Sequence, residues 1–166
     1  MNRDLFFSSV NQQYETPQWL FDKLNSVFFF KRDLAADSSN AKCKRYFSIH
    51  EGTDSLITSW DFIGWQWLNP PYGRELYEWV EKCANEAKEG NNICLLIPAR
   101  TDTKYQHELI FKHARLVCFV RGRLKFGNSK NSAPFPSQIV LFTNGEIMLN
   151  QIDVLNSVGE CVTVIR

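Results

Sequence analysis

The chain has 166 residues, of which 44% are hydrophobic and 14% aromatic, and its formal net charge is +1. This size and composition predict one globular domain with a sizeable core. Because the net charge is close to zero, any surface for nucleic acid must come from local clustering of basic residues. No apolar run reaches the length of a membrane span and no signal-peptide pattern opens the chain, so we expect no membrane association and a cytoplasmic location.

The cysteines and histidines do not have the spacing of a metal site. The five cysteines form no CxxC pair, and three of them, Cys83, Cys94 and Cys118, lie within apolar runs. The three histidines show neither triad nor metal-ligand spacing. We therefore expect reduced, mostly buried thiols and no metal.

The N-terminal part predicts a lead-in, a helix and a strand. Residues 1–13 are polar and mixed, and we expect a loosely held lead-in to a single domain over residues 14–166. Thr16 and Pro17 predict a helix start, with Thr16 as N-cap and Pro17 at the first helical position. Apolar residues follow at helical spacing as far as Phe28. Residues 31–37 indicate a short buried strand that ends in acidic residues, whereas 38–53 fit either a loop or a short helix.

The middle of the chain predicts a strand, a stiff loop and a helix. Residues 65–68 indicate a buried strand, and residues 75–89 carry an apolar stripe at helical spacing. The sequence Asn-Pro-Pro-Tyr-Gly at 69–73 connects them. Each proline fixes its own φ and pushes the preceding residue toward extended geometry, so we expect this loop to be rigid.

The second half predicts further strands and one helix. Residues 93–97 and 116–120 are continuous apolar runs, typical of strands covered on both faces. Between them, Thr103 and Gln106 resemble a capping box, which predicts a helix to about residue 113.

A last core strand is predicted at residues 138–142. Because no helix separates it from the strand before, the two should form a hairpin. Residues 143–166 are expected to form one or two short edge strands. Together the elements predict an α/β fold with one mostly parallel sheet and an antiparallel terminal strand.

The 69–73 loop could hold an exocyclic amine. Open α/β sheets bind ligands at the carboxyl ends of their strands. The Asn69 side-chain oxygen and the Pro70 carbonyl could accept from the two N–H groups of an adenine amine, while Tyr72 stacks on the base. Such acceptors would stabilise the positive charge that grows on the nitrogen as it attacks an activated methyl group held in line with it. A base in a duplex must first be flipped out. The alternative is that the motif is only a turn.

A local basic stretch lies between the last two core strands. Basic charge beside Phe126 and Phe135 suits phosphate contact and stacking, and the alternative is an ordinary solvated loop. Arg100, just past a strand end, could face the same cleft. The basic residues of the stretch are Arg121, Arg123, Lys125 and Lys130.

Several short segments carry a family resemblance. They are residues 14–17 (Tyr-Glu-Thr-Pro), 33–37 (Asp-Leu-Ala-Ala-Asp), 40–47, 54–56, 69–73, 98–102 (Pro-Ala-Arg-Thr-Asp), 121–126 (Arg-Gly-Arg-Leu-Lys-Phe) and 133–137 (Ala-Pro-Phe-Pro-Ser). Together they resemble the phage-type DNA N-6-adenine methyltransferases, the phage Dam family, over about residues 14–142. The resemblance implies a Rossmann-like methyltransferase, dependent on S-adenosyl-L-methionine, of a kind typically encoded by phages and prophages.

The resemblance also implies roles for individual residues. The catalytic loop of amino-methyltransferases matches Asn69, Pro70, Pro71 and Tyr72, with Asn69 also close to the cofactor. The basic loop at residues 121–137 is then the small DNA-contact element.

Cofactor contacts follow from the same resemblance. The first cofactor motif matches residues 33–37, which assigns Asp33, Ala35 and Asp37. Thr16 and Pro17 resemble a motif that touches the methionine end of the cofactor, and Asp54 lies where related enzymes often place an acid on its adenine amine. In one departure, Ala35-Ala36-Asp37 stands where most methyltransferases have a Gly-rich turn.

Each of these polar residues also has a purely structural interpretation. Asp33 and Asp37 could be solvated strand-end acids or a helix cap, Asp54 could be an N-cap, and Asn40 could be a turn residue. Thr16 is a good N-cap in any case.

The expected function is methylation of adenine N6 in double-stranded DNA by a monomer or weak dimer, in the host cytoplasm if a phage encodes the chain. One alternative is a different acceptor, either an adenine in RNA or a glutamine amide in a protein. Another is a catalytically silent DNA-binding or anti-restriction module, against which the intact Asn69 and Tyr72 argue.

Overall fold

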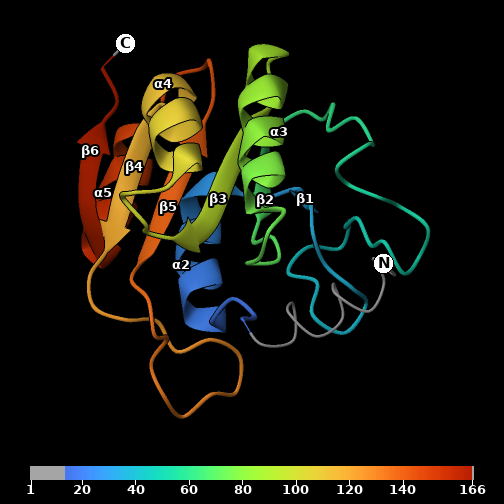
Figure 1. Cartoon of the computed structure of the whole chain (residues 1–166), viewed down its shortest axis with the longest axis horizontal. Coiled ribbons are helices and arrows are strands. Elements are labelled where there is room, and N and C mark those ends of the chain that lie inside the picture. Colours follow the sequence, from blue (N-terminus) through green and yellow to red (C-terminus); the bar gives the residue numbers. More distant parts are fainter. Residues whose placement is uncertain (1–13, 166) are drawn as a thin grey trace.

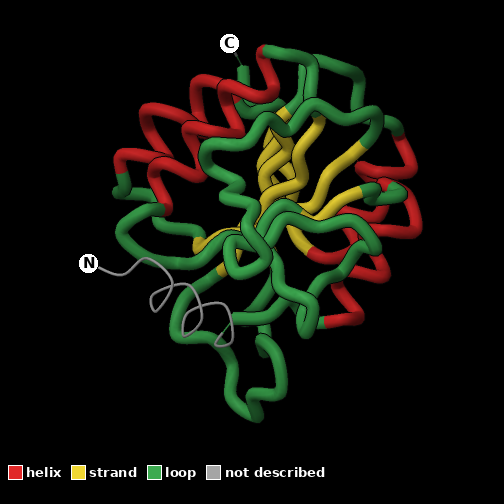
Figure 2. Tube along the Cα trace, turned by 90° about the vertical axis from the view of Figure 1, so that its right-hand side faces the viewer, coloured by secondary structure: helices red, strands yellow, loops and turns green. Residues whose placement is uncertain are grey.

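The computed structural model describes residues 14–165, and the predicted lead-in at 1–13 lies outside them. Six strands of this part form one sheet with helices on both faces (Figures 1 and 2). None of the helices in this part has the length and apolar character that a membrane crossing needs.

The sheet has the strand order β1-β2-β3-β5-β4-β6. Its strands are β1 (Arg32–Asp33), β2 (Trp65–Leu68), β3 (Asn92–Pro98), β4 (Leu116–Val120), β5 (Ser137–Phe142) and β6 (Gly159–Thr163). Pairing is parallel from β1 to β2 and from β2 to β3, and antiparallel at β3–β5, β5–β4 and β4–β6. The predicted α/β class is confirmed, as is the hairpin of β4 and β5.

The expectation of a mostly parallel sheet is not confirmed, because three of the five pairings are antiparallel. The cause is the connection after β4. Residues 121–136 form a loop without a helix. A crossover between parallel strands usually contains a helix, whereas this loop returns β5 antiparallel to β4. β5 then takes the place between β3 and β4.

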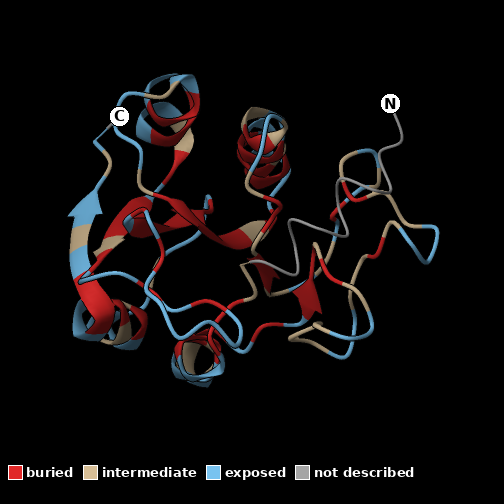
Figure 3. Cartoon of the chain, turned by 60° about the horizontal axis from the view of Figure 1, so that its bottom comes forward, coloured by how far each residue is buried: buried red, intermediate tan, exposed pale blue. Residues whose placement is uncertain are grey.

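Two pairs of helical segments cover the two faces of the sheet (Figure 1). On one face lie α2 (Gln18–Phe28) and α5 (Leu149–Val158). On the other lie α3 (Leu76–Lys88) and η1 (Tyr105–Ile110), a π-helical stretch that continues into α4 (Phe111–His113). The central strands are buried between these layers (Figure 3).

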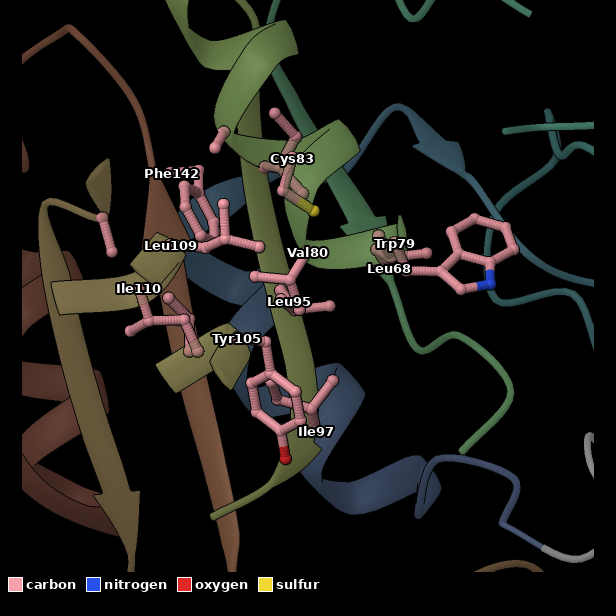
Figure 4. Packing of buried hydrophobic residues seen from close by; sticks show 14 of the residues in the cluster. Leu68, Trp79, Val80, Cys83, Leu95, Ile97, Tyr105, Leu109, Ile110 and Phe142 are labelled. Carbon is pink, nitrogen blue, oxygen red and sulfur yellow. The ribbon is translucent and has the colours of Figure 1, made fainter. Parts of the chain in front are cut away.

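The core follows from the alternation of side chains along β3. Leu95 points toward the α3 side and joins one apolar cluster, whereas Leu96 points toward the α2 side and joins the other. Figure 4 shows side chains of the first cluster packed between α3, η1, β3 and β5, among them Val80, Leu109 and Phe142. This two-sided burial explains why β3 is a continuous apolar run in the sequence.

Three local predictions differ from the structure. Residues 149–158 form α5, where edge strand was expected, and only 159–163 form β6. No Ser, Thr, Asp or Asn caps the start of α5, where the N-cap residue is Met148. The Met148 N–H donates to the Gln151 side chain (3.0 Å). The proposed capping box is also wrong, since the Thr103 hydroxyl donates to the Arg100 carbonyl (2.8 Å).

The third difference is at β1, which is shorter than residues 31–37. Beyond its end the chain still pairs, because the Ala36 N–H donates to the Phe47 carbonyl. The undecided segment 38–53 forms turns and not a helix. Within this segment, residues 45–47 lie beside β1 and form backbone hydrogen bonds with residues 33 and 36.

We expect Gly159→Ala to destabilise the fold strongly. A Cβ at Gly159 would lie 2.1 Å from the Phe119 carbonyl oxygen and 2.9 Å from the Cys118 sulfur. Both atoms belong to β4, which is held in the sheet on both sides and cannot retreat. The free energy of unfolding, measured by urea denaturation, should fall by about 1–3 kcal/mol or more.

Gly145→Ala is the matched control, because its Cβ would make an ordinary contact 3.4 Å from the Thr143 hydroxyl. Equal urea midpoints for the two variants would contradict the close approach of β6 to β4.

Candidate active site

The loop from β2 to α3 lies at the carboxyl ends of β1, β2 and β3 (Figure 1). The strand before it and the helix after it are where the sequence predicted them. Pro70 and Pro71 are buried, whereas Asn69 and Tyr72 are half-buried. The two prolines therefore anchor the loop, and the two polar side chains remain partly accessible.

The polar groups of the Asn69 side chain are bonded on both sides. Its Nδ2 donates to the Tyr14 carbonyl (2.8 Å) and to the Thr16 hydroxyl (3.0 Å). Its Oδ1 accepts from the Tyr72 hydroxyl (2.6 Å), which also lies 3.2 Å from the Leu96 carbonyl of β3. These partners fix which end of the amide is the acceptor and where it points.

This arrangement corrects the prediction that Thr16 caps the first helix. No side chain caps α2, and its N-cap residue is Pro17. The Thr16 hydroxyl is instead an acceptor for Asn69. A Thr-Pro pair looks the same in the sequence in either role, so local pattern could not distinguish them.

Tyr14 lies inside an aromatic cage, which we define as the rings of Tyr72, Phe126 and Phe135. The Tyr14 ring stacks on Tyr72 with centroids 5.4 Å apart and planes at 26°. Its contacts with Phe126 (5.5 Å) and Phe135 (5.1 Å) are edge-on. Both phenylalanines belong to the 121–136 loop, so this loop is packed directly onto the Asn-Pro-Pro-Tyr segment. The structure thus holds one flat ring between three others.

Two pockets flank the end of β1 and meet at Ala35, which lines both. The first, which we call the nucleoside pocket after the role proposed for it below, has about 360 Å³ of space not filled by atoms, part of it open to solvent, and is lined by Leu34, Ala35, Asp37, Ile49, Asp54, Pro71 and others. The polar pocket, about 270 Å³ by the same measure, is lined by Glu15, Thr16, Asp33, Ala35, Asn40, Lys42, Trp67 and Asn69.

Most residues predicted to bind a cofactor therefore come together from four separate segments. Pro17 is the exception, because it lines neither pocket. The parallel pairing of β1 with β2 explains the convergence, since it brings residues 33–37 and 69–71 to one edge of the sheet.

Asp33 is a buried carboxyl group and not a solvated strand-end acid. It is 3% exposed, and its two oxygens accept from the backbone N–H groups of Ala35 (3.2 Å) and Lys42 (3.1 Å). Burial raises its pKa to about 7, although these hydrogen bonds act in the opposite direction. Asp33 thus holds the 35–42 turn in place as well as lining the polar pocket.

The other acids also organise turns. Asp37 accepts from the Ser48 hydroxyl (2.7 Å), and its N–H donates to the Asn40 side chain (2.8 Å), which is the turn role considered for Asn40. Asp54 accepts from the Leu56 N–H (3.0 Å) in a turn, and no helix begins there. Asp37 and Asp54 nevertheless line the nucleoside pocket together.

The predicted DNA-contact residues lie outside both pockets. Those on the 121–136 loop are exposed, and among their side chains Arg123 alone is seen to bond within the described part of the chain, from its Nη1 to the Ala133 carbonyl (3.3 Å). Arg100 is exposed at the end of β3. The structure therefore links the basic loop to Tyr72 through the aromatic cage and leaves its charges in solvent.

The sequence did not indicate that Tyr14, Thr16 and the cage phenylalanines contact Asn69 or Tyr72 of the loop. Tyr14 stood out only as part of a four-residue segment, and no local signal indicates which ring it meets. Lys42 and Ile49 were also missed, because 38–53 showed no periodicity.

The Asn-Pro-Pro-Tyr loop and both pockets lie at the carboxyl ends of parallel strands, which is where open α/β sheets bind ligands. Residues 6–149 match the family model described as DNA N-6-adenine-methyltransferase (Dam). A search of curated proteins gave no match. The chain belongs to the DNA N-6-adenine-methyltransferase (Dam) family, which confirms the resemblance seen in the sequence.

The buried Asp33 should make stability depend on pH. Its pKa is raised from 3.8 to about 7 in the folded state. Between these pH values the folded protein holds a proton on Asp33 that the unfolded chain has lost. Its contribution to stability is fully present below pH 4 and is lost as pH rises to 7, by up to about 4 kcal/mol. The difference in unfolding free energy between wild type and Asp33→Asn, followed from pH 4 to 8, measures it. A difference that is constant over this range would contradict the raised pKa.

Proposed function

We propose that this chain transfers a methyl group from S-adenosyl-L-methionine to the N6 amine of an adenine flipped out of double-stranded DNA. One observation carries the proposal. Asn69, the residue expected to hold the amine, lines the same pocket as Thr16, expected at the methionine end of the donor, and Asp33, expected to contact the donor through the first cofactor motif. Amine and methyl donor would then meet at Asn69, as transfer requires.

The pockets suit the two halves of this donor. The nucleoside pocket offers the apolar side chains of Ile49 and Pro71 for the faces of a purine. Its carboxylates, Asp37 and Asp54, can accept from amine and hydroxyl groups. The polar pocket offers Asp33 to an ammonium group and Lys42 to a carboxylate, as the amino-acid end needs. The donor's sulfonium would supply the methyl group.

The Asn69 side-chain oxygen and the Pro70 carbonyl can both accept from the N–H groups of the target amine, even with the hydrogen bonds that Asn69 already makes. An amide oxygen has two lone pairs, and Tyr72 occupies only one of those on Asn69. Among the backbone hydrogen bonds of the described residues, none uses the Pro70 carbonyl. Both acceptors would strengthen as positive charge develops on the nitrogen, so they favour the transition state over the bound base. The nitrogen gives its extra proton to solvent after transfer.

The base would replace Tyr14 in the aromatic cage. A purine stacked on Tyr72 needs the space that the Tyr14 ring fills here. An aromatic pair of this kind contributes about 0.5–1.5 kcal/mol beyond burial, a small barrier that base stacking offsets. The exposed cations of the 121–136 loop, adjacent to the cage, would contact phosphates of the same DNA.

Asn69→Ala should abolish methyl transfer, because it removes the acceptor nearest the proposed transition state. The test is tritiated methyl transfer from S-adenosyl-L-methionine to DNA, RNA and protein in parallel. We expect label in DNA only, and a loss of at least about 100-fold in the variant.

Circular dichroism and donor binding by calorimetry show whether the variant keeps its fold. Turnover by a folded Asn69→Ala at the wild-type rate would refute the mechanism, and label in RNA or protein would refute the acceptor.

Tyr14→Ala should lower the KM for DNA by about 2- to 10-fold, because the base no longer competes with a ring for the cage. Steady-state kinetics on DNA measure the change. Tyr14→Phe is the matched control and should behave as wild type, since it keeps the ring and the backbone carbonyl that holds Asn69. A KM that rises in Tyr14→Ala would show that the ring itself assists DNA binding.

A further inference from the structure

A second groove borders the Asn-Pro-Pro-Tyr loop on the side of α3 and η1. By the measure used for the two pockets, its volume is about 1080 Å³, part of it open to solvent, and it shares no lining residue with the nucleoside pocket or the polar pocket. Its lining includes three cations and three tyrosines: Arg74, Arg100, Lys104, Tyr72, Tyr77 and Tyr105. We call this surface the α3–η1 groove.

The topology brings these cations together. Arg74 precedes α3, Arg100 follows β3, and Lys104 precedes η1. Arg74 lies in the connection from β2 to α3, and Arg100 and Lys104 lie in the connection from β3 to η1. Both connections begin at the carboxyl ends of neighbouring parallel strands (Figure 1). The three cations therefore converge although they are up to 30 residues apart in the sequence.

The α3–η1 groove has a buried tyrosine in its wall and exposed cations around it. Tyr105 is buried, and its hydroxyl donates to the Pro98 carbonyl (3.3 Å). The cations are exposed, and within residues 14–165 no salt bridge engages any of them. No acidic side chain lines the groove. Glu108 lies at the border of the groove, where its carboxylate accepts from the Tyr77 hydroxyl (3.0 Å). Three exposed cations beside aromatic rings suit a nucleic-acid backbone.

Tyr72 belongs both to the α3–η1 groove and to the aromatic cage. It also packs against both core clusters, so it stands at the boundary between the two faces of the sheet. A DNA strand whose base enters the cage must continue past Tyr72. Because each strand carries one phosphate for roughly every 3.4 Å of helix axis, the phosphates next to the flipped nucleotide come within reach of the groove.

We propose that the α3–η1 groove binds the sugar-phosphate backbone of the DNA strand that carries the target adenine, next to the flipped nucleotide. The inference rests on the proposed function for its substrate. It adds Arg74 and Lys104 to the DNA-contact residues and gives Arg100 a place apart from the 121–136 loop. The target strand is then held on both sides of Tyr72.

The test measures DNA binding by the full chain, which needs no turnover. Fluorescence anisotropy of a labelled duplex of mixed sequence gives the Kd from 50 to 200 mM salt for wild type, Arg74→Gln, Lys104→Gln and the double variant. We expect weaker binding and a salt slope, log K against log salt, reduced by about 0.9 for each phosphate that the variant no longer neutralises. Donor binding by calorimetry should be unchanged, because the cofactor pockets share no residue with the groove.

Lys88→Gln is the matched control. Lys88 is exposed at the last position of α3, about 20 Å along the helix from the end near Arg74, so its slope should equal that of wild type. If wild type binds DNA and the groove variants keep the Lys88→Gln slope, the groove proposal is wrong while the proposed function stands. If wild type neither binds nor methylates DNA, both proposals fail.

Discussion

The site depends on one side-chain amide. The Asn69 side chain ties the loop after β2 to Tyr14 and Thr16, which precede α2. Within the same loop it also accepts from the Tyr72 hydroxyl. Tyr72 in turn reaches a carbonyl of β3. Because donors and acceptors of an amide are not interchangeable, this set of partners has one orientation only. The proposed acceptor of the target amine is therefore oriented before any ligand arrives, as electrostatic preorganisation requires.

The sheet provides the frame for this amide. The parallel part, β1 to β3, sends its strand ends and the following loops to one edge, and there the nucleoside pocket, the polar pocket and the α3–η1 groove lie. The antiparallel part adds the 121–136 loop, whose phenylalanines contact Tyr72 edge-on. Each half thus supplies a different component, the two proposed cofactor pockets from one and the phenylalanines of the cage with the basic residues from the other.

Several of these features were predictable from sequence because their signals are local. The apolar runs at 93–97 and 116–120 indicated the central strands, since burial on both faces leaves no place for polar residues. The place of the Asn-Pro-Pro-Tyr loop between strand and helix was predictable from its prolines and from the patterns on either side. Residues 33–37 were assigned through the family resemblance, and the parallel pairing of β1 with β2 places them beside this loop. The resemblance rested on 33–37, 69–73 and the other short segments, and not on the apolar strand runs.

What sequence could not provide are the long-range partners. Thr16 carries an N-cap pattern, yet its hydroxyl serves Asn69, 53 positions away. β5 lies between β3 and β4, and no local sequence pattern indicates which strands it pairs with. The helix α5 begins with a Gln151 side chain in place of a standard cap, so its start carried no recognisable signal.

The tie between Asn69 and residues 14–16 has a consequence for the integrity of the molecule. These residues precede the first helix, and the sheet and both apolar clusters are built from elements that follow them. A cut between Thr16 and α2 would leave nearly all of the core in place and release the amide from two of its three partners. Under the proposed function, proteolytic trimming at this point would therefore impair methyl transfer before it impairs the fold.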